Sequence, residues 1–400
     1  MLTFLSVILV TISIGLKNKV WLFILMYSSA LLVYSLALDG MHADLWHEMF
    51  VKDVVYLSLE IYWLWVVLFI SNLVFVFFLS NAESCYKVVD YRYVEYLKLV
   101  AFLFMLLSLS AGGYSWYLAG DINLMLSNPR EWEMKFGVSV VRNYFYFLHL
   151  PALVIFGFVY KYSSFIGKWV CIFCITILLL LTFIHGIKFT IIHGFMFLSF
   201  SFFVANNERV PKSVYLLLLM LILTIILFFV FVRGGGVDGL VGYIVSASVN
   251  SMYEVNKSLL FVGDAWRLTP FNLESLSRIY IRLLGEFPVR ETVGLPESFA
   301  LNDKYNLQNA ITVVGFGGGC FFIVLSYMLA VVINLLRRQY IFDVRNLYFK
   351  VFILSALVML FTAWEFSKTK LWYVFLCLFI VHYFYVLVVK SLCFGCKYKQ

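Results

Sequence analysis

Charged residues are scarce in this chain, at 13% of 400 residues, whereas apolar residues make up 63% and aromatic residues 20%. A water-soluble domain of this length has too little interior to bury so much apolar surface. The composition therefore excludes an ordinary soluble globular protein, and we expect a lipid bilayer to surround most of the chain.

Long apolar runs dominate the sequence, and they lack the period-2 alternation of membrane-spanning β-strands. A helix needs about 20 apolar residues to cross the hydrocarbon core of a bilayer. The expected fold is all-α, a polytopic integral membrane protein with about 11 transmembrane helices and one large external loop. The candidate spans are approximately residues 2–16, 20–39, 54–80, 98–119, 144–160, 165–184, 189–205, 213–232, 309–336, 350–365 and 371–390.

The loops between these spans carry unequal charge, which orients the chain. If alternate loops face the cytoplasm, that set holds 16 Lys or Arg and 5 acidic residues, whereas the rest of the chain holds 14 and 17. The positive-inside rule then places the N-terminus and residues 233–307 outside. The net charge of +8 is the basic rim of a membrane protein, so nucleic acid is not an expected partner. The cytoplasmic loops are 17–19, 81–98, 161–168, 206–212, 337–350 and 390–400.

None of the seven cysteines lies in a predicted external loop, so no disulfide framework is expected. Cys393 and Cys396 have the spacing of a zinc ligand pair, but no second pair or histidine accompanies them. We favour a reduced cytoplasmic tail over a metal site.

The spans and loops divide the chain into three predicted regions. These are an N-terminal transmembrane bundle (1–232), a large external loop with amphipathic helices (233–307), and C-terminal transmembrane helices with a cytoplasmic tail (308–400). Arg233 opens the loop and is followed by three glycines, which permit close approach of a ligand but also commonly end helices.

Within the loop, Glu274, Arg278, Arg282 and Glu286 recur every four residues and would form one stripe on a helix. One reading is a solvated helix held by ion pairs. However, a purely structural stripe would avoid two like charges one turn apart. Stacked guanidinium groups suit bidentate capture of phosphate, so we favour phosphate binding.

Two basic residues at the outer ends of predicted spans could each be an interface anchor or a ligand contact, and the sequence leaves this open. Lys188 is either an anchor at the membrane interface or, together with Arg233 on the same membrane face, part of a site for an anionic headgroup. Arg142, at the mouth of the fifth span, serves equally well as an anchor or as a ligand contact, whereas Arg130 is better explained as an anchor.

Several short motifs together resemble the Wzy-type O-antigen and capsule polymerases. Ile187-Lys188 marks a tight outward turn before a helical hairpin, and Val232-Arg233-Gly234-Gly235 opens the external loop, with Tyr243 near its start. The segment Asn306–Ala310 followed by Gly315–Gly319 is similar to the glycine-rich return helix of that family. The resemblance covers most of the chain as topology. The related O-antigen ligases use a histidine in the large loop, and residues 233–307 contain none, which argues for a polymerase.

The resemblance implies a glycosyltransferase of the GT-C type in the bacterial inner membrane, with its active site facing the periplasm and no cofactor or metal. It would join oligosaccharide repeat units carried on undecaprenyl diphosphate, with a chain-length regulator as a candidate partner protein. A sugar hydroxyl would attack the anomeric carbon while undecaprenyl diphosphate leaves, so cations would stabilise the developing negative charge.

We assign that catalytic role to Arg233, Arg278 and Arg282. The general base is left open among Glu286, Glu291 and Asp238. Supporting substrate contacts are expected from Lys188, Arg142, Arg290 and Tyr243.

Other classes of function stay open beside this one. A flippase or transporter for lipid-linked oligosaccharides would meet the same anionic carrier, but the long loop 233–307 counts against it. An O-antigen ligase and a membrane O-acyltransferase are further enzyme readings. The latter would show an arginine motif near its histidine, and none accompanies His42 or His47. A structural or assembly protein is the least specific reading, and the arginine stripe argues against it.

Overall fold

The computed structural model describes residues 90–120, 144–184, 188–206, 343–358 and 369–389. It also describes the short stretches 123–124, 131–132, 135, 216, 219–220, 223, 327–328 and 331–332. Every regular element among these residues is helical, which confirms an all-helical fold for this part of the chain. The helices belong almost entirely to one compact unit, formed by Glu83–Phe228, Leu336–Ser355 and Lys370–Gln400. The three-region division made from the sequence stays a prediction.

The longest of the described helices is α5 (Tyr91–Ala119), which begins before the predicted span at residue 98 because Asp90 caps it. The Asp90 carboxylate accepts a hydrogen bond from the backbone N–H of Arg92 at 2.9 Å, which satisfies an amide that lacks a helical partner. Gly120, at φ 79°, ends the helix in a left-handed conformation that favours glycine. The first turns of α5 were assigned to a loop, and that assignment was wrong.

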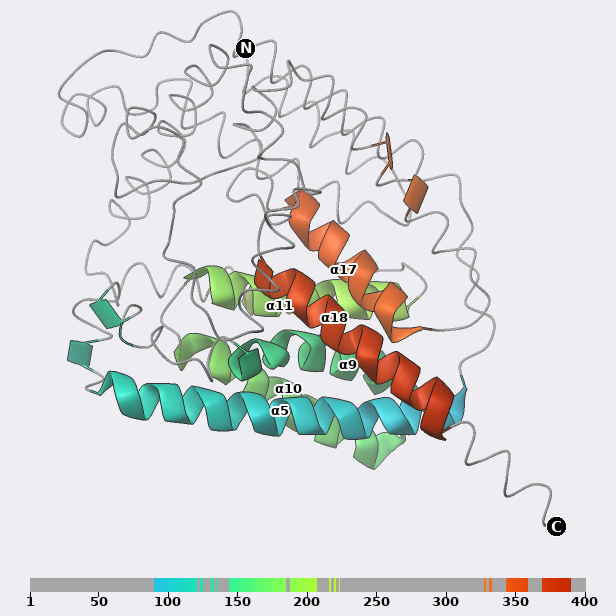
Figure 1. The fold of residues 1–400 in the computed structure, drawn as a ribbon, viewed down its shortest axis with the longest axis horizontal. Helices are drawn as coiled ribbons and strands as arrows, with labels where there is room; N and C mark the ends of the chain where they lie inside the picture. Colours follow the sequence, from blue (N-terminus) through green and yellow to red (C-terminus); the bar gives the residue numbers. More distant parts are fainter. Residues whose placement is uncertain are drawn as a thin grey trace, which may run out of the picture. The chain divides into compact units, whose positions relative to one another are not determined.

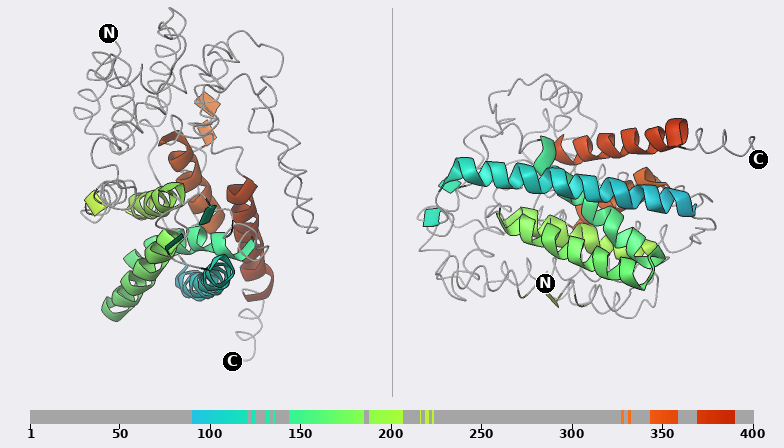
Figure 2. Two further views of the ribbon diagram at one scale, coloured as in Figure 1. Left: turned by 90° about the vertical axis from the view of Figure 1, so that its left-hand side faces the viewer. Right: turned by 90° about the horizontal axis from the view of Figure 1, so that it is seen from below.

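Three further helices lie between residues 146 and 205. They are α9 (His149–Tyr162), preceded by the single 3₁₀ turn η1 (Tyr146–Leu148), then α10 (Phe165–Ile184) and α11 (Lys188–Ala205). All three confirm helices predicted at nearly these bounds. Helix α9 lies between α5, α10 and α11, and every side chain from His149 to Val159 is buried. Figures 1 and 2 show this arrangement.

A close contact joins α9 to α11, which run in the same direction. A Cβ atom on Gly157 would lie 2.9 Å from Ser201 Oγ and 3.1 Å from Leu198 Cδ1. The Ser201 hydroxyl donates a hydrogen bond to the carbonyl of Val154 on α9. Small residues at this α9–α11 contact therefore let the two backbones approach.

The C-terminal part contributes α17 (Val344–Val358) and α18 (Thr369–Phe384), the latter continued by one π-helical turn, η8 (Tyr385–Val389). Helix α17 begins earlier than the predicted span at residue 350, because Asp343 caps it. The Asp343 carboxylate accepts from the backbone N–H of Arg345 at 2.8 Å.

The predicted bounds place Lys350 at the end of the cytoplasmic loop 337–350 and at the start of the span 350–365. It lies within α17 and its side chain is buried, with 1% of its surface exposed. A cation inside a helix bundle is costly to desolvate, and within a membrane such residues mark functional positions.

Two described helices are long and apolar enough to cross a membrane, Tyr91–Leu118 and Phe165–Thr182. Shorter apolar helices run over Tyr146–Tyr162, Thr190–Ala205 and Tyr373–Val388. The total of about 11 spans inferred from apolar run lengths stays a prediction.

The helix ends fall into two groups. Lys161, at the end of α9, donates to the carbonyl of Ala205, at the end of α11, at 2.7 Å. The Tyr385 hydroxyl, at the end of α18, donates to Asp90, before the start of α5, at 2.8 Å. Helices α5, α10 and α17 begin where α9, α11 and α18 finish (Figure 1). We call the end of the helix group where these termini meet the Asp343 end. The opposite end, where α11 begins, is the Lys188 end.

Candidate functional site

The structure describes little of the site predicted from the sequence. Lys188 is described only as the first residue of α11. The other predicted site residues lie outside the described part of the chain, and their roles stay predictions: Arg142, Arg233, Asp238, Tyr243, Arg278, Arg282, Glu286, Arg290 and Glu291.

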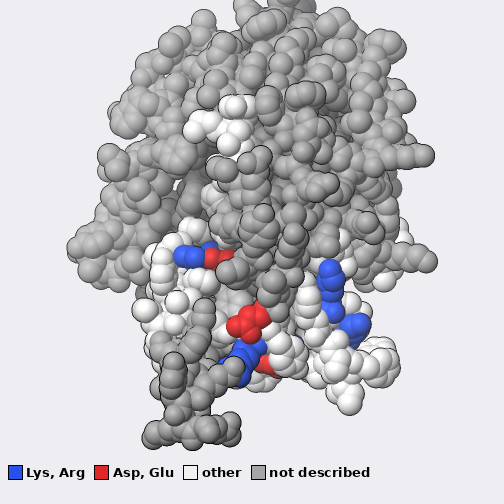
Figure 3. Space-filling model, turned by 90° about the vertical axis from the view of Figure 1, so that its right-hand side faces the viewer, with Lys and Arg blue, Asp and Glu red and all other residues white. Residues whose placement is uncertain are grey.

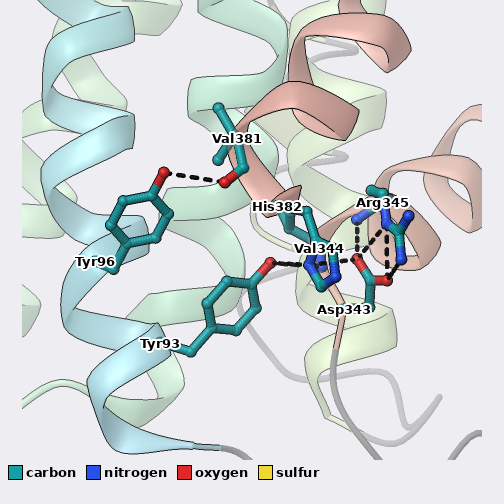
Figure 4. A network of polar contacts seen from close by, with 7 residues as sticks. All are labelled: Tyr93, Tyr96, Asp343, Val344, Arg345, Val381 and His382. Atoms are coloured by element: carbon teal, nitrogen blue, oxygen red, sulfur yellow. Dashed lines mark hydrogen bonds and ion pairs between the residues drawn. The ribbon is translucent and has the colours of Figure 1, made fainter. Parts of the chain in front are cut away.

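The densest polar cluster among the described residues is at the Asp343 end and was not predicted. Figure 4 shows side chains from α5, α17 and α18 meeting around the Asp343 carboxylate. Arg345 Nε donates to Asp343 Oδ2 at 2.9 Å and the guanidinium forms a bidentate ion pair with this carboxylate. His382 Nδ1 lies 3.3 Å from Asp343 Oδ1 and 3.0 Å from the Tyr93 hydroxyl oxygen.

The cluster joins α5 to α17 and α18, two consecutive helices that follow more than 220 residues later in the sequence. The Tyr93 hydroxyl accepts the backbone N–H of Val344 at 3.4 Å, so α5 contacts the first turn of α17. The Tyr96 hydroxyl donates to the carbonyl of Val381 on α18 at 3.0 Å. The first of these bonds satisfies the Val344 amide at the start of α17, where backbone partners run out.

Aromatic rings of α18 support the Arg345 guanidinium. Its Cζ lies 4.5 Å from the centre of the Phe379 ring and 5.1 Å from that of Tyr383. These residues are one helical turn apart, so they form one face of α18. A guanidinium stacked on aromatic rings and paired with a carboxylate is fixed in position, because its charge and its faces are both engaged.

This arrangement is suited to holding helices rather than to binding a metal. The Asp343 oxygens are already engaged by Arg345 and His382. Within the described ranges, no group of three or more His, Cys, Asp or Glu side chains is placed to hold a metal ion.

A second polar site lies at the Lys188 end, inside the helix group. His149 is fully buried, and its Nδ1 lies 2.6 Å from the carbonyl oxygen of Tyr146. Nδ1 must therefore carry the proton and donate, which leaves a lone pair on Nε2. Nε2 has no hydrogen-bond partner in the described part of the chain, and His193 is close enough to interact electrostatically with His149.

Hydroxyl groups secure the backbone around His149. The Ser108 hydroxyl lies 3.0 Å from the carbonyl oxygens of both Phe145 and Tyr146, and the Tyr146 hydroxyl donates to the carbonyl of Leu181 at 3.0 Å. Helices α5 and α10 are thus joined, through η1 at the start of α9, by polar contacts in a largely apolar interior. An unsatisfied buried acceptor costs about 1–3 kcal/mol, so Nε2 suits a water molecule or a ligand hydroxyl.

The sequence offered one signal for the unpredicted cluster. The pattern Asp-x-Arg occurs at Asp90 and Arg92 and again at Asp343 and Arg345, each time directly before an apolar run. An aspartate at this position is typical of a helix N-cap. It could have corrected both helix starts, but nothing in the sequence pairs Asp343 with His382.

No protein-family model, curated protein or solved structure matches this chain. The resemblance to Wzy-type polymerases therefore depends on the sequence motifs alone.

Proposed function

We propose that this chain is a multi-pass glycosyltransferase of the bacterial inner membrane. It would polymerise oligosaccharide repeat units linked to undecaprenyl diphosphate, with its active site facing the periplasm. The observation that carries the proposal is the four-residue spacing of Arg278 and Arg282 in the sequence of a long polar segment that begins at Arg233, a spacing that would place the two side chains one turn apart on a helix.

Exposed apolar side chains support the membrane part of the proposal. Phe165, Trp169 and Phe173 of α10 each expose more than 60% of their surface. Burial of apolar surface is favourable by roughly 25 cal/mol per Å², so water is a poor solvent for this side of α10 and lipid a good one.

The alternation of helix directions supports the sidedness. The ends gathered at the Asp343 end belong to loops that the charge count assigns to the cytoplasm. With that assignment the Lys188 end faces the periplasm. Arg233 and the predicted loop 233–307 belong on the same face, so a lipid diphosphate would meet Lys188 as well as the arginines.

The chemistry follows from charge. A hydroxyl of the incoming repeat unit attacks the anomeric carbon of the growing chain, the bond to the diphosphate oxygen breaks, and undecaprenyl diphosphate leaves with its electron pair. Arg233, Arg278 and Arg282 stabilise this negative charge. A carboxylate takes the hydroxyl proton, with Glu286, Glu291 and Asp238 as candidates. Lys188, Arg142, Arg290 and Tyr243 contact the substrate.

The experiment is a comparison of arginine variants in cells whose only polymerase is this chain. Arg233→Ala should abolish long polysaccharide chains while single repeat units are still transferred to the lipid A core. Arg278→Lys should also impair polymerisation, because a point charge does not replace a planar guanidinium. Arg130→Ala is the matched control and should leave chain length unchanged. Long chains in the Arg233→Ala strain would refute the role of this residue.

Sidedness has its own test. An alkaline phosphatase reporter fused after Asp264 should be active, and a reporter that works only in the cytoplasm should be silent at the same position. The opposite pattern would overturn the topology.

A further inference from the structure

Two lysines at the Asp343 end stand on either side of the turn between α9 and α10. Lys161 Nζ donates to the carbonyl of Ala205 and lies 5.6 Å from the ring centre of Tyr162. Lys168 Nζ lies 5.8 Å from the ring centre of Tyr160. Cation–π contacts therefore hold both ammonium groups beside tyrosine rings and near the last turns of α9 and α11.

Neither ammonium group has a carboxylate partner in the described part of the chain. Other basic residues do: Lys98 lies 2.6 Å from Glu95, and Lys135 lies 3.0 Å from Glu131. On the face of the molecule in Figure 3, basic side chains likewise appear both beside acidic ones and apart from them. Lys161 and Lys168 therefore leave a positive charge that nothing in the described ranges neutralises.

An exposed apolar stripe begins at the same place. Phe165, Trp169 and Phe173 recur every four residues on α10, and their exposed fractions are 77%, 61% and 66%. Side chains four apart lie on one side of a helix. Lys168 precedes Trp169 directly, so a cation stands beside the start of a surface that favours hydrocarbon.

We propose that Lys161 and Lys168 bind the phosphate of an anionic phospholipid whose acyl chains lie along the exposed side of α10. The cations select a negative headgroup, and the apolar stripe selects a lipid over free phosphate. The site is separate from the predicted catalytic loop. It depends on the membrane location given under the proposed function, but not on polymerase activity.

The test uses the purified full-length chain in detergent, titrated with phosphatidylglycerol and followed by native mass spectrometry. Each lysine near an anionic headgroup contributes about fivefold in affinity. The double variant Lys161→Gln/Lys168→Gln should therefore bind phosphatidylglycerol about thirty-fold more weakly than the wild type. Phosphatidylcholine, which has no net charge, should bind both proteins alike, and Lys161→Arg/Lys168→Arg should bind phosphatidylglycerol like the wild type.

The matched control is Lys98→Gln/Lys135→Gln, which removes the same charge from two lysines that have carboxylate partners. It should bind phosphatidylglycerol like the wild type. If the first glutamine variant does not fold, the single variant Lys168→Gln carries the test, because this ammonium group makes no hydrogen bond within the described ranges. About a fivefold loss is expected.

Three results would overturn the proposal: equal binding by the wild type and the glutamine variant, an equal loss in the control, or inorganic phosphate competing fully with phosphatidylglycerol. Carbonate extraction separates this from the proposed function. If the wild type washes out of membranes, the membrane location itself is wrong. If it stays but makes no polymer, only the enzyme assignment fails.

Discussion

The cluster around Asp343 and the α9–α11 contact hold helices together by different means. At the first, charged and aromatic side chains join α5 to α17 and α18, two consecutive helices that follow more than 220 residues later in the sequence. At the second, α9 and α11, which are separated only by α10, approach closely at Gly157 and Ser201, and hydrogen bonds run from Ser201 to Val154 and from Lys161 to Ala205. Close backbone packing supported by single hydrogen bonds holds α9 against α11, whereas a network of directional bonds fixes α5 against helices that return after a long excursion of the chain.

Asp343→Asn should have the largest effect on stability, because it leaves Arg345 and His382 without a negative partner. Breaking a buried ion pair costs about 3–5 kcal/mol, and partial exposure of Arg345 reduces this to about 2–3 kcal/mol. Thermal unfolding in detergent, followed by circular dichroism, would measure the loss. The control is Glu95→Gln, which breaks the exposed pair with Lys98 and should cost at most about 0.5 kcal/mol. Equal losses would show that the cluster is not a special contact.

Gly157→Ala should have the second-largest effect on stability, because the new methyl group would lie too close to the Cβ and Oγ of Ser201. Overpacking of this kind costs about 1–3 kcal/mol. Adding Ser201→Gly should restore part of the stability, since both clashing atoms are removed. Gly113→Ala is the control: nothing lies within 4 Å of its Cβ position, and alanine favours a helix by about 0.5–1 kcal/mol. A stable Gly157→Ala protein would contradict the close contact.

Tyr385→Phe should have the smallest effect, because it removes one hydrogen bond to Asp90 Oδ2 and leaves the Oδ1 cap in place. We expect a loss of about 0.5–1.5 kcal/mol in the same unfolding measurement. Tyr117→Phe, at a tyrosine that is 84% exposed, should change nothing. A loss as large as that of Asp343→Asn would mean that Asp90, and not Asp343, is the centre of the cluster.

The helices themselves were largely predictable from the sequence. Apolar run lengths predicted α10 at its observed bounds, α11 within one residue and the end of α9 within two residues, whereas α9 begins five residues after the predicted start. The starts of α5 and α17 were predicted too late along the chain. A hydropathy run begins after the last charged residue, whereas a helix begins where its first backbone amides are capped. The burial of Lys350 was not predicted, because its position at the boundary between a loop and a span does not show which helices pack around it.

The site was less predictable than the helices. The pairing of His382 with Asp343 and Tyr93 depends on three helices meeting, and no local pattern encodes that meeting. In the sequence, His149 is an isolated polar residue in an apolar run. Its interest as a site depends on the lone pair of Nε2, which becomes evident only from the contact of Nδ1 with the Tyr146 carbonyl in the structure. The arginine stripe in residues 273–286 stays a prediction from spacing alone.

The central claim is that guanidinium groups in the loop 233–307 stabilise a departing lipid diphosphate. The most direct measurement is polymerisation by the purified full-length chain in lipid vesicles, supplied only with a repeat unit on undecaprenyl diphosphate. The wild type should yield a ladder of longer saccharides with one undecaprenyl diphosphate released for each bond formed, and Arg233→Ala should yield none. A wild-type chain that returns its substrate unchanged, or an Arg233→Ala chain that makes the same ladder, would contradict the claim.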